Sequence, residues 1–227
     1  MRVPHLNFSR YAIYYIPDLP LFQISSDWLG WNSITGQETL LSADHRHITD
    51  RPRKYGFHAT MKPPFSLASH ATQGELQEAF HAFCATVSPA IGGTLKISRL
   101  GWFLAMTQDV QSNEVTELAE STVSHFDKFR APLSDNDIEK RRRRRLTPQQ
   151  DALMLRWGYP YVMQEYKFHM TLTGPLAHDT IDDIERRANS MFHDFLDQPL
   201  NINSLALMGE EEGSGRFLVI EKLSLGI

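Results

Sequence analysis

Short apolar segments alternate with polar connections along the chain, and their spacing predicts both strands and helices. Residues 11–16 combine aromatic and β-branched side chains and stop at Pro17, as expected of a buried strand. Helical spacing of apolar residues predicts helices over residues 19–31, 73–88, 113–130, 148–158 and 181–196. Alternation predicts further strands over residues 94–100, 102–107, 200–208 and 217–225. Residues 36–54 are polar and are predicted to form a connection.

One stretch of the sequence occurs twice. Residues 57–65, FHATMKPPF, align with residues 168–176, FHMTLTGPL, at a constant offset of 111 residues. The same order of elements follows each copy: a short loop, a helix and two strands. We therefore predict two related lobes, 1–110 and 111–227. Residues 131–150 differ in composition from their surroundings and are predicted to be an insertion.

The tripeptide His-x-Thr is by itself a weak signal, because it occurs five times, beginning at His47, His58, His70, His169 and His178. Three of these copies lie in predicted turns or helix starts. Only the copies at His58 and His169 share the preceding Phe, the strand alternation and a Pro four residues after the Thr. The duplicated context, rather than the tripeptide, indicates a functional site.

Both copies place polar residues on one face of a predicted strand. The strand period of two puts His58 and Thr60 on one face, and it does the same for His169 and Thr171. If the lobes pack about a pseudo-twofold axis, these polar faces meet across one cleft. One imidazole can then accept a proton while the other donates one, and the threonine hydroxyls can donate to an anionic oxygen. These four residues are the predicted catalytic group, and their chemistry suits phosphoryl transfer without a metal or other cofactor.

Further residues are candidate substrate contacts, each with a structural alternative. Lys62 and its counterpart Thr173 continue the two polar faces, although a lysine here is also consistent with a plain surface position. Arg10, at the start of the first strand, is a candidate phosphate ligand or a solvated strand end. Tyr11 is a candidate cleft contact or a core residue, with Tyr14 on the opposite face of its strand. The last two candidates, at equivalent positions three residues before each histidine, are Tyr55 and Tyr166.

Composition and charge limit the classes of function. Hydrophobic residues make up 41% and charged residues 22%, as in ordinary globular proteins, and the formal charge of -4 gives no overall attraction to nucleic acid or anionic membrane. The single cysteine, Cys84, cannot form an internal disulfide. The start, residues 1–8, lacks an apolar leader, and no run is long enough to span a membrane. We therefore expect a cytoplasmic protein without a membrane partner.

Two charged motifs have less specific meanings. Five successive arginines, Arg141 to Arg145, are interpreted as a solvated helix face, with RNA binding or folding over the cleft as alternatives. The pair His45 and His47 has the form of a metal-binding HxH sequence, but no further ligands at suitable spacing complete it. No metal site is predicted.

The two FHxT strands resemble the signature of the two-histidine (2H) phosphoesterase superfamily. Other segments are similar to a bacterial branch of that superfamily associated with phosphonate metabolism: residues 10–14, 55–65, 156–161 and 168–174. The resemblance spans nearly the whole chain. It implies an α+β fold of two lobes, with antiparallel sheets around a central cleft and helices outside. It also implies His58 and His169 as the catalytic histidines, with Thr60 and Thr171 at the hydroxyl positions.

The expected function is a metal-independent cyclic phosphodiesterase that acts on a small phosphorylated metabolite, with a link to phosphonate metabolism that the resemblance alone implies. Two alternatives remain open at this point. The same site would suit an RNA or nucleotide 2′,3′-cyclic phosphate, for which the arginine run is the special support. A nucleotide-binding module without turnover is the second alternative, although intact histidines and threonines in both copies argue against it.

Overall fold

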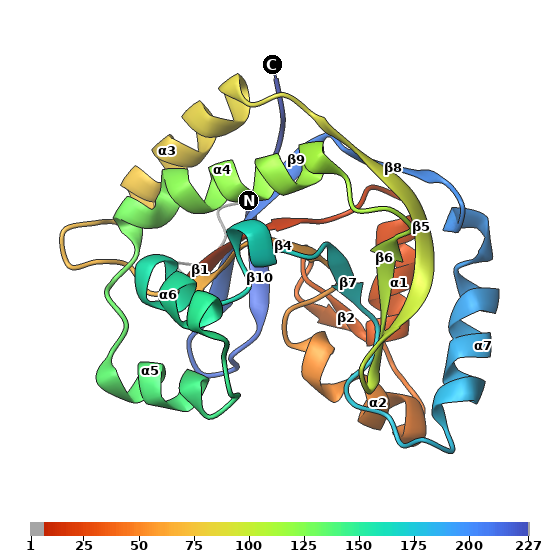
Figure 1. Cartoon of the computed structure of the whole chain (residues 1–227). Coiled ribbons are helices and arrows are strands. Elements are labelled where there is room, and N and C mark those ends of the chain that lie inside the picture. Colours follow the sequence, from red (N-terminus) through yellow and green to blue (C-terminus); the bar gives the residue numbers. More distant parts are fainter. Residues whose placement is uncertain (1–6, 227) are drawn as a thin grey trace.

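The computed structural model describes residues 7–226 of the chain, so most of the segment in which no leader was predicted lies outside the described residues. Eight strands form one sheet: β1 (Phe8–Tyr15), β4 (Ala59–Phe65), β5 (Ala90–Leu100), β6 (Phe103–Gln108), β7 (His169–Thr171), β8 (Pro199–Ile202), β9 (Ser204–Glu211) and β10 (Phe217–Ser224). Their order is β10-β9-β1-β4-β7-β6-β5-β8, and every neighbouring pair is antiparallel (Figure 1). Two short strands, β2 (Trp31–Asn32) and β3 (Gln37–Glu38), pair separately.

Seven α-helices accompany the sheet in the described residues: α1 (Leu21–Leu29), α2 (Ala43–Arg53), α3 (Gln73–Thr86), α4 (Asn113–Phe126), α5 (Asp135–Arg142), α6 (Pro148–Trp157) and α7 (Ile181–Met191). The predicted helices are present, and the predicted α+β class is confirmed. The capping box of Thr72 and Glu75 starts α3, and Gly30, in the left-handed region at φ 75°, ends α1. None of the helices in residues 7–226 has the length and apolar character of a membrane span.

The predicted connection at residues 36–54 is wrong, because it contains the helix α2. Ser42 caps its start, with its hydroxyl accepting from the amide of His45. The buried positions of this helix include His45, Thr49 and Arg53. Because these residues are polar, α2 lacks the apolar periodicity from which a helix is predicted.

The chain crosses between the two halves of the sheet. One half consists of β10, β9, β1 and β4, and the other of β7, β6, β5 and β8. The strand predicted over residues 200–208 is interrupted at Asn203, where β8 ends on one half and β9 begins on the other. Each predicted lobe, 1–110 and 111–227, therefore contributes strands to both halves.

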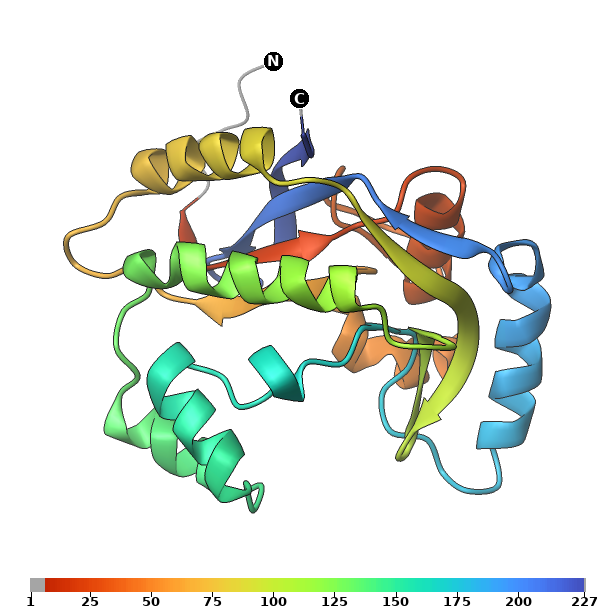
Figure 2. The ribbon, with the colours of Figure 1, turned by 45° about the horizontal axis from the view of Figure 1, so that its top comes forward.

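The two faces of the sheet are packed differently. The main core lies on one face and includes apolar residues of α1, α3, α4 and α7, while a smaller cluster lies on the other. β1 shows the division, since Tyr11 and Ile13 belong to the main core and Ala12 and Tyr14 to the smaller cluster. Figure 2 shows α7 beside the outer strands, with α5 and α6 grouped at the opposite end of the molecule. The histidines lie on the face of the smaller cluster.

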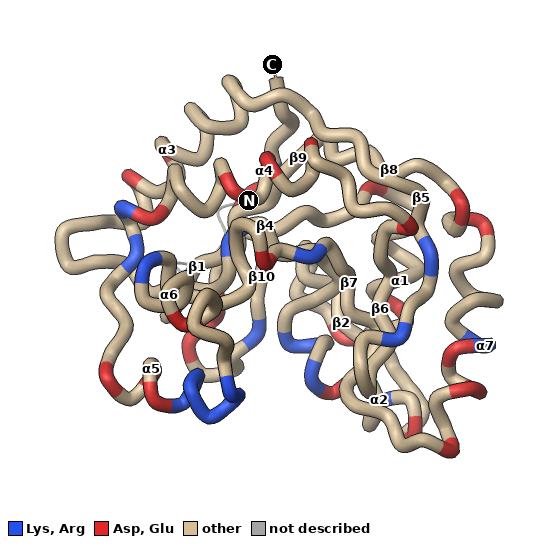
Figure 3. The backbone as a smooth tube through the Cα atoms, in the orientation of Figure 1, with Lys and Arg blue, Asp and Glu red and all other residues tan. Residues whose placement is uncertain are grey.

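The predicted insertion, residues 131–150, contains α5 and the start of α6. None of the residues of α5 is buried. Its arginine run continues into the following turn, where basic residues gather at one edge of the molecule (Figure 3). This segment therefore adds little to the core, but it adds a concentrated positive charge.

Candidate active site

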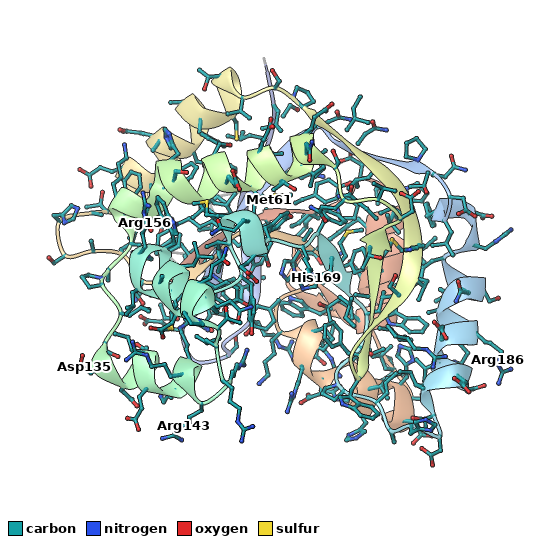
Figure 4. All side chains as sticks on the ribbon, viewed as in Figure 1. Met61, Asp135, Arg143, Arg156, His169 and Arg186 are labelled. Atoms are coloured by element: carbon teal, nitrogen blue, oxygen red, sulfur yellow. The ribbon has the colours of Figure 1, made fainter. Side chains whose placement is uncertain are left out.

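The two copies of the repeated motif are neighbouring strands of the sheet. Ala59 on β4 pairs with Met170 on β7, and these two residues are equivalent positions of the repeat at the offset of 111. Since the pairing is antiparallel, the flanking residues also lie opposite each other, His58 beside Thr171 and Thr60 beside His169. The four predicted catalytic residues thus share one face of two adjacent strands, with His169 near the centre of the molecule (Figure 4).

The polar faces of the two copies were expected to meet across a cleft, and in the structure they lie side by side on neighbouring strands. The local twofold axis passes between β4 and β7 within a single sheet. Because paired strands lie about 5 Å apart, side chains from both copies can contact the same small group.

Each histidine ring is held by a backbone carbonyl two residues earlier. The Nδ1 atom of His58 lies 2.9 Å from the Gly56 oxygen, and that of His169 lies 2.8 Å from the Lys167 oxygen. A carbonyl oxygen only accepts, so Nδ1 carries the hydrogen in both rings. The Nε2 atom of each ring is therefore not used by this bond, and it can accept a proton when the ring is neutral or donate one when the ring is protonated.

Gly56 is the residue that the turn before His58 requires. Its φ of +73° lies in the left-handed region, and a Cβ atom here would lie 2.9 Å from the side chain of Ser33. The turn follows the end of α2 and directs the Gly56 carbonyl at the His58 ring. Glycine at this position thus allows the turn whose carbonyl group orients the imidazole ring.

The surroundings of the two histidines are not equivalent. The His58 ring stacks on Tyr14, with centroids 3.7 Å apart, and Tyr55 lies 6.1 Å away. Burial lowers the pKa of His58 to about 4, against the Gly56 carbonyl, which raises it, and with a smaller lowering from His169. His58 is therefore neutral near pH 7. No aromatic ring in residues 7–226 stacks on His169, which is the more accessible partner.

The depressed pKa of His58 can be measured directly. In an NMR titration of the imidazole C–H signals, His58 is expected to protonate near pH 4. Tyr14→Ala removes the stacked ring and admits water, so the midpoint should rise toward the ordinary 6.5. Tyr161→Ala, at an exposed position, is the control and should leave it unchanged. A wild-type midpoint near 6.5 would contradict this account.

Two predicted contacts lie on the wrong face of the sheet. Tyr11 is buried in the main core, where its hydroxyl donates to the Gln73 Oε1 atom at 3.0 Å. Tyr166 packs against the same core, with its hydroxyl 3.8 Å from the sulfur of Met61. The assignment of these two tyrosines as ligands is therefore corrected. Strand alternation places Tyr14, rather than Tyr11, beside His58.

Lys62 is also placed away from the cleft. It is only 1% exposed, and its ammonium group donates to the Val123 carbonyl at 3.0 Å and to the Asp127 carboxylate at 3.3 Å. The C-terminal end of α4 thus covers this part of β4. The predicted phosphate contact is replaced by an internal ion pair.

Arg10 and Thr173 are near the site but already have partners. Two guanidinium nitrogens of Arg10 donate to the Glu210 carboxylate, each at 2.5 Å, so its charge is balanced within the protein. The buried Thr173 hydroxyl accepts from the Leu104 amide at 3.0 Å. Thr173 therefore forms part of the wall of the site, and the backbone uses one acceptor position of its hydroxyl.

A cavity of about 210 Å³ opens beside His58 and Thr171. Its lining includes Arg51, Tyr55, His58, Phe103, Thr171 and Thr173. Arg51 comes from the last turn of α2, and no carboxylate in residues 7–226 forms an ion pair with it. Sequence reasoning missed Arg51 because it missed α2.

The polar face continues beyond His169 onto β6. Thr107 pairs with His169 across the sheet, and its hydroxyl lies 2.7 Å from that of Ser98. Lys96 pairs in turn with Thr107. Strand alternation within β5 and β6 places these polar residues on one face of each strand. Nothing in the sequence alone shows that this face lies beside the histidines.

The HxH sequence does not form a metal site. His45 is buried, and its Nε2 atom lies 2.7 Å from the Trp28 carbonyl oxygen. In the described part of the chain, no three His, Cys, Asp or Glu side chains are grouped so as to hold a metal ion.

Comparison with known proteins gives one family match and two long alignments. The family model described as "Protein of unknown function (DUF1045)" matches residues 60–218. A protein of Janthinobacterium sp. (strain Marseille) named ribose 1,5-bisphosphate phosphokinase PhnN is 35% identical over 98% of this chain and 52% of its own length. A protein of the same name from Laribacter hongkongensis (strain HLHK9) is 32% identical over 92% of this chain and 50% of its own length. The chain spans about half the length of these relatives.

Solved structures with a similar course of the chain share little sequence with it. E. coli LigT complexed with 3′-AMP aligns with a TM-score of 0.45 and 10% identity, covering 97% of this chain and 100% of LigT. TT0787 of Thermus thermophilus aligns with a TM-score of 0.45 and 12% identity, covering 96% of this chain and 98% of TT0787.

Proposed function

The chain belongs to the DUF1045 family, and from that premise we propose that it is a metal-independent cyclic phosphodiesterase that acts on small phosphorylated sugars. The observation that carries the proposal is the paired histidine arrangement. His58 and His169 share one face of two adjacent strands, and their Nδ1 atoms are held by equivalent carbonyls. A neutral imidazole and a protonated one on the same face supply both proton transfers of a phosphate ester hydrolysis.

The different surroundings of the two histidines support one proposed division of their roles. His58, with a pKa of about 4, is unprotonated at neutral pH, and its Nε2 atom takes a proton from water as the water oxygen bonds to phosphorus. The bond from phosphorus to one ring oxygen breaks, and His169 acts as the acid, with its Nε2 atom donating a proton to that oxygen. The product is a phosphate monoester, and solvent returns both histidines to their starting states.

Other groups on this face would stabilise the charge of the reacting phosphate. The Thr60 and Thr171 hydroxyls can donate to its non-bridging oxygens, and the guanidinium group of Arg51 lies in the lining of the adjacent cavity. In the resting site, Thr60 Oγ1 lies 3.3 Å from His58 Nε2. The Thr60 hydroxyl would therefore turn from the imidazole to the phosphate when substrate binds.

The proposed substrate class is a ribosyl cyclic phosphate. The two half-matching relatives have names that describe a kinase of ribose 1,5-bisphosphate. This chain contains no phosphate-binding sequence of the form G-x-x-x-x-G-K followed by Ser or Thr, so we do not carry the kinase activity over to it. Opening a ribosyl 1,2-cyclic phosphate would produce a ribose phosphate monoester, a compound chemically close to the one in those names. The phosphonate link of the sequence resemblance fits the same substrate class.

Phosphorus NMR tests this proposal. Purified protein in EDTA is incubated with ribose 1,2-cyclic phosphate, a nucleoside 2′,3′-cyclic phosphate and a short RNA ending in a cyclic phosphate. We expect ring opening of the ribosyl compound to a monoester. Preferred turnover of the RNA would favour the alternative that the arginine run supports, and binding without product would favour the nucleotide-binding module.

A further inference from the structure

The arginine run is divided into two kinds of side chain. Arg142 donates to the Asp151 carboxylate through two nitrogens, at 2.7 and 2.8 Å, and Arg143 lies 3.8 Å from Glu139. Arg141 and Arg144 form no ion pair within residues 7–226. The run is therefore not a uniform solvated face, because only part of its charge is balanced by the protein.

Arg141 is partly buried although no carboxylate pairs with it. Its guanidinium group lies over the ring of Tyr159, 5.5 Å from the centroid. Burial lowers the pKa of Arg141, and the positive charges of Arg144 and Arg10 lower it further, against Tyr159 and Asp137, which raise it. Because removing a cation from water without a counter-charge is costly, this cluster suits an anion that comes from outside the protein.

Two tyrosines, Tyr14 and Tyr55, lie beside His58, and a third, Tyr159, lies under Arg141. Burial raises the pKa of Tyr14 well above its ordinary value, and Tyr55, Tyr159 and Glu210 raise it further, while Arg10 lowers it. Burial likewise raises the pKa of Tyr159, on which Arg144 and Arg141 act in the opposite direction. The Tyr14 and Tyr159 phenols therefore stay protonated at neutral pH, so they are hydrogen-bond donors.

The phenols are also free to donate. None of the hydroxyls of Tyr14, Tyr55 and Tyr159 has a hydrogen-bond partner in the part of the chain that the structure describes. Tyr14 and Tyr55 pack against His58, and Tyr159 lies under Arg141, so unpaired donors are present both at the reacting site and at an unpaired arginine. Unpaired donors that lead to unpaired cations are the components of an anion-binding site.

We propose that Arg141, Arg144 and Tyr159 bind a second, terminal phosphate of the substrate while its cyclic phosphate reacts at His58 and His169. The inference rests on the proposed function and makes its substrate class more specific: a small cyclic phosphate ester whose sugar also carries a phosphate monoester. Arginine matches the planar geometry of phosphate oxygens and keeps its charge when partly buried. Arg10 is not included, because its charge is balanced by Glu210 and its guanidinium group lies over the ring of Phe217, 5.9 Å from the centroid.

Paired substrates and paired variants test this subsite. Ribose 1,2-cyclic phosphate is compared with its 5-phosphate derivative, using an Arg141→Gln, Arg144→Gln double variant. We expect KM for the 5-phosphate derivative to rise about 10-fold or more, as for the loss of charged hydrogen bonds, with kcat nearly unchanged. KM for the compound without the 5-phosphate should not change.

The matched control is Arg142→Gln, Arg143→Gln, which removes the same charge from the same run. Both arginines are exposed and paired, and Figure 4 shows Arg143 at the outer edge of the molecule, away from His169. This variant should change KM for neither substrate. An equal rise of KM in both double variants would overturn the proposal, because it would indicate a general effect of the positive charge.

A binding measurement separates this proposal from the proposed function. Ribose 5-phosphate and ribose are titrated into the resting protein by calorimetry. We expect ribose 5-phosphate to bind the wild type and the control variant, and to bind the Arg141→Gln, Arg144→Gln variant about 10-fold or more weakly. This result would support the subsite even if no cyclic phosphate were hydrolysed. Equal affinity for ribose and ribose 5-phosphate would overturn it, even if ring opening were observed.

Discussion

His58→Ala and His169→Ala are each expected to reduce kcat for ring opening by about 10²- to 10⁴-fold, the contribution of general acid–base catalysis. The reason is geometric: in the proposed mechanism, one Nε2 atom accepts a proton and the other donates one, and the two histidines share one face of β4 and β7. Because the two residues act in one step, the double variant should lose less than the product of the two single effects. Initial rates by phosphorus NMR measure these losses.

A change of leaving group separates the two roles. A phenolate leaves without protonation more readily than an alkoxide does, so a cyclic phosphate of catechol needs the acid less. On this substrate, His169→Ala should recover much of its activity, whereas His58→Ala should stay impaired because water still has to lose a proton. The opposite recovery would reverse our assignment of acid and base.

His178→Ala is the matched control for both histidine variants. His178 is exposed and stands in another His-x-Thr sequence, but it lies outside the duplicated context. Its replacement should leave turnover unchanged. Loss of activity in this variant, or normal turnover in the His58→Ala, His169→Ala double variant, would contradict the two-histidine mechanism.

The face that carries the two histidines could be predicted because it depends on local pattern. A fixed offset of 111 residues and the strand period of two place His58, Thr60, His169 and Thr171 on equivalent strand faces, whatever the connections between them. The pairing of Ala59 with Met170 then follows the repeat. The sequence could not show that the two copies are neighbours in one sheet, because pairing over such a distance is decided by the whole fold.

The surroundings of the face depend on contacts distant in sequence, and there the predictions failed. Arg51 reaches the cavity from α2, a helix whose buried side is polar and therefore has no apolar period. Tyr11 and Tyr14 are similar in the sequence, and only the packing on each side of β1 decides which of them meets His58. The starts of α3 and α6, in contrast, followed from capping boxes that act within one turn.

Lys62 was predicted to bind phosphate, and its buried ion pair gives a second large expected effect, on stability. Asp127→Ala should lower the free energy of unfolding by about 3–5 kcal/mol, because it leaves a buried ammonium group without its carboxylate. Arg130, which also donates to Asp127 at 2.8 Å, would lose its partner as well. Urea unfolding followed by circular dichroism measures the change. Asp151→Ala, which breaks the exposed pair with Arg142, is the control and should have little effect.

Lys62→Met separates a structural lysine from a ligand. Removing the ammonium group replaces a buried charge by an apolar side chain of similar length, so stability at pH 7 should change much less than in Asp127→Ala. Burial lowers the pKa of Lys62 to about 8 from 10.5, so between these pH values the unfolded chain binds more protons. The stability of the wild type should therefore gain from this group as pH rises through that range, and the gain should be absent in Lys62→Met.

Turnover of Lys62→Met should stay near the wild-type rate, since Lys62 does not line the cavity. A loss of turnover of about 10-fold or more in a stably folded Lys62→Met protein would return Lys62 to the substrate site.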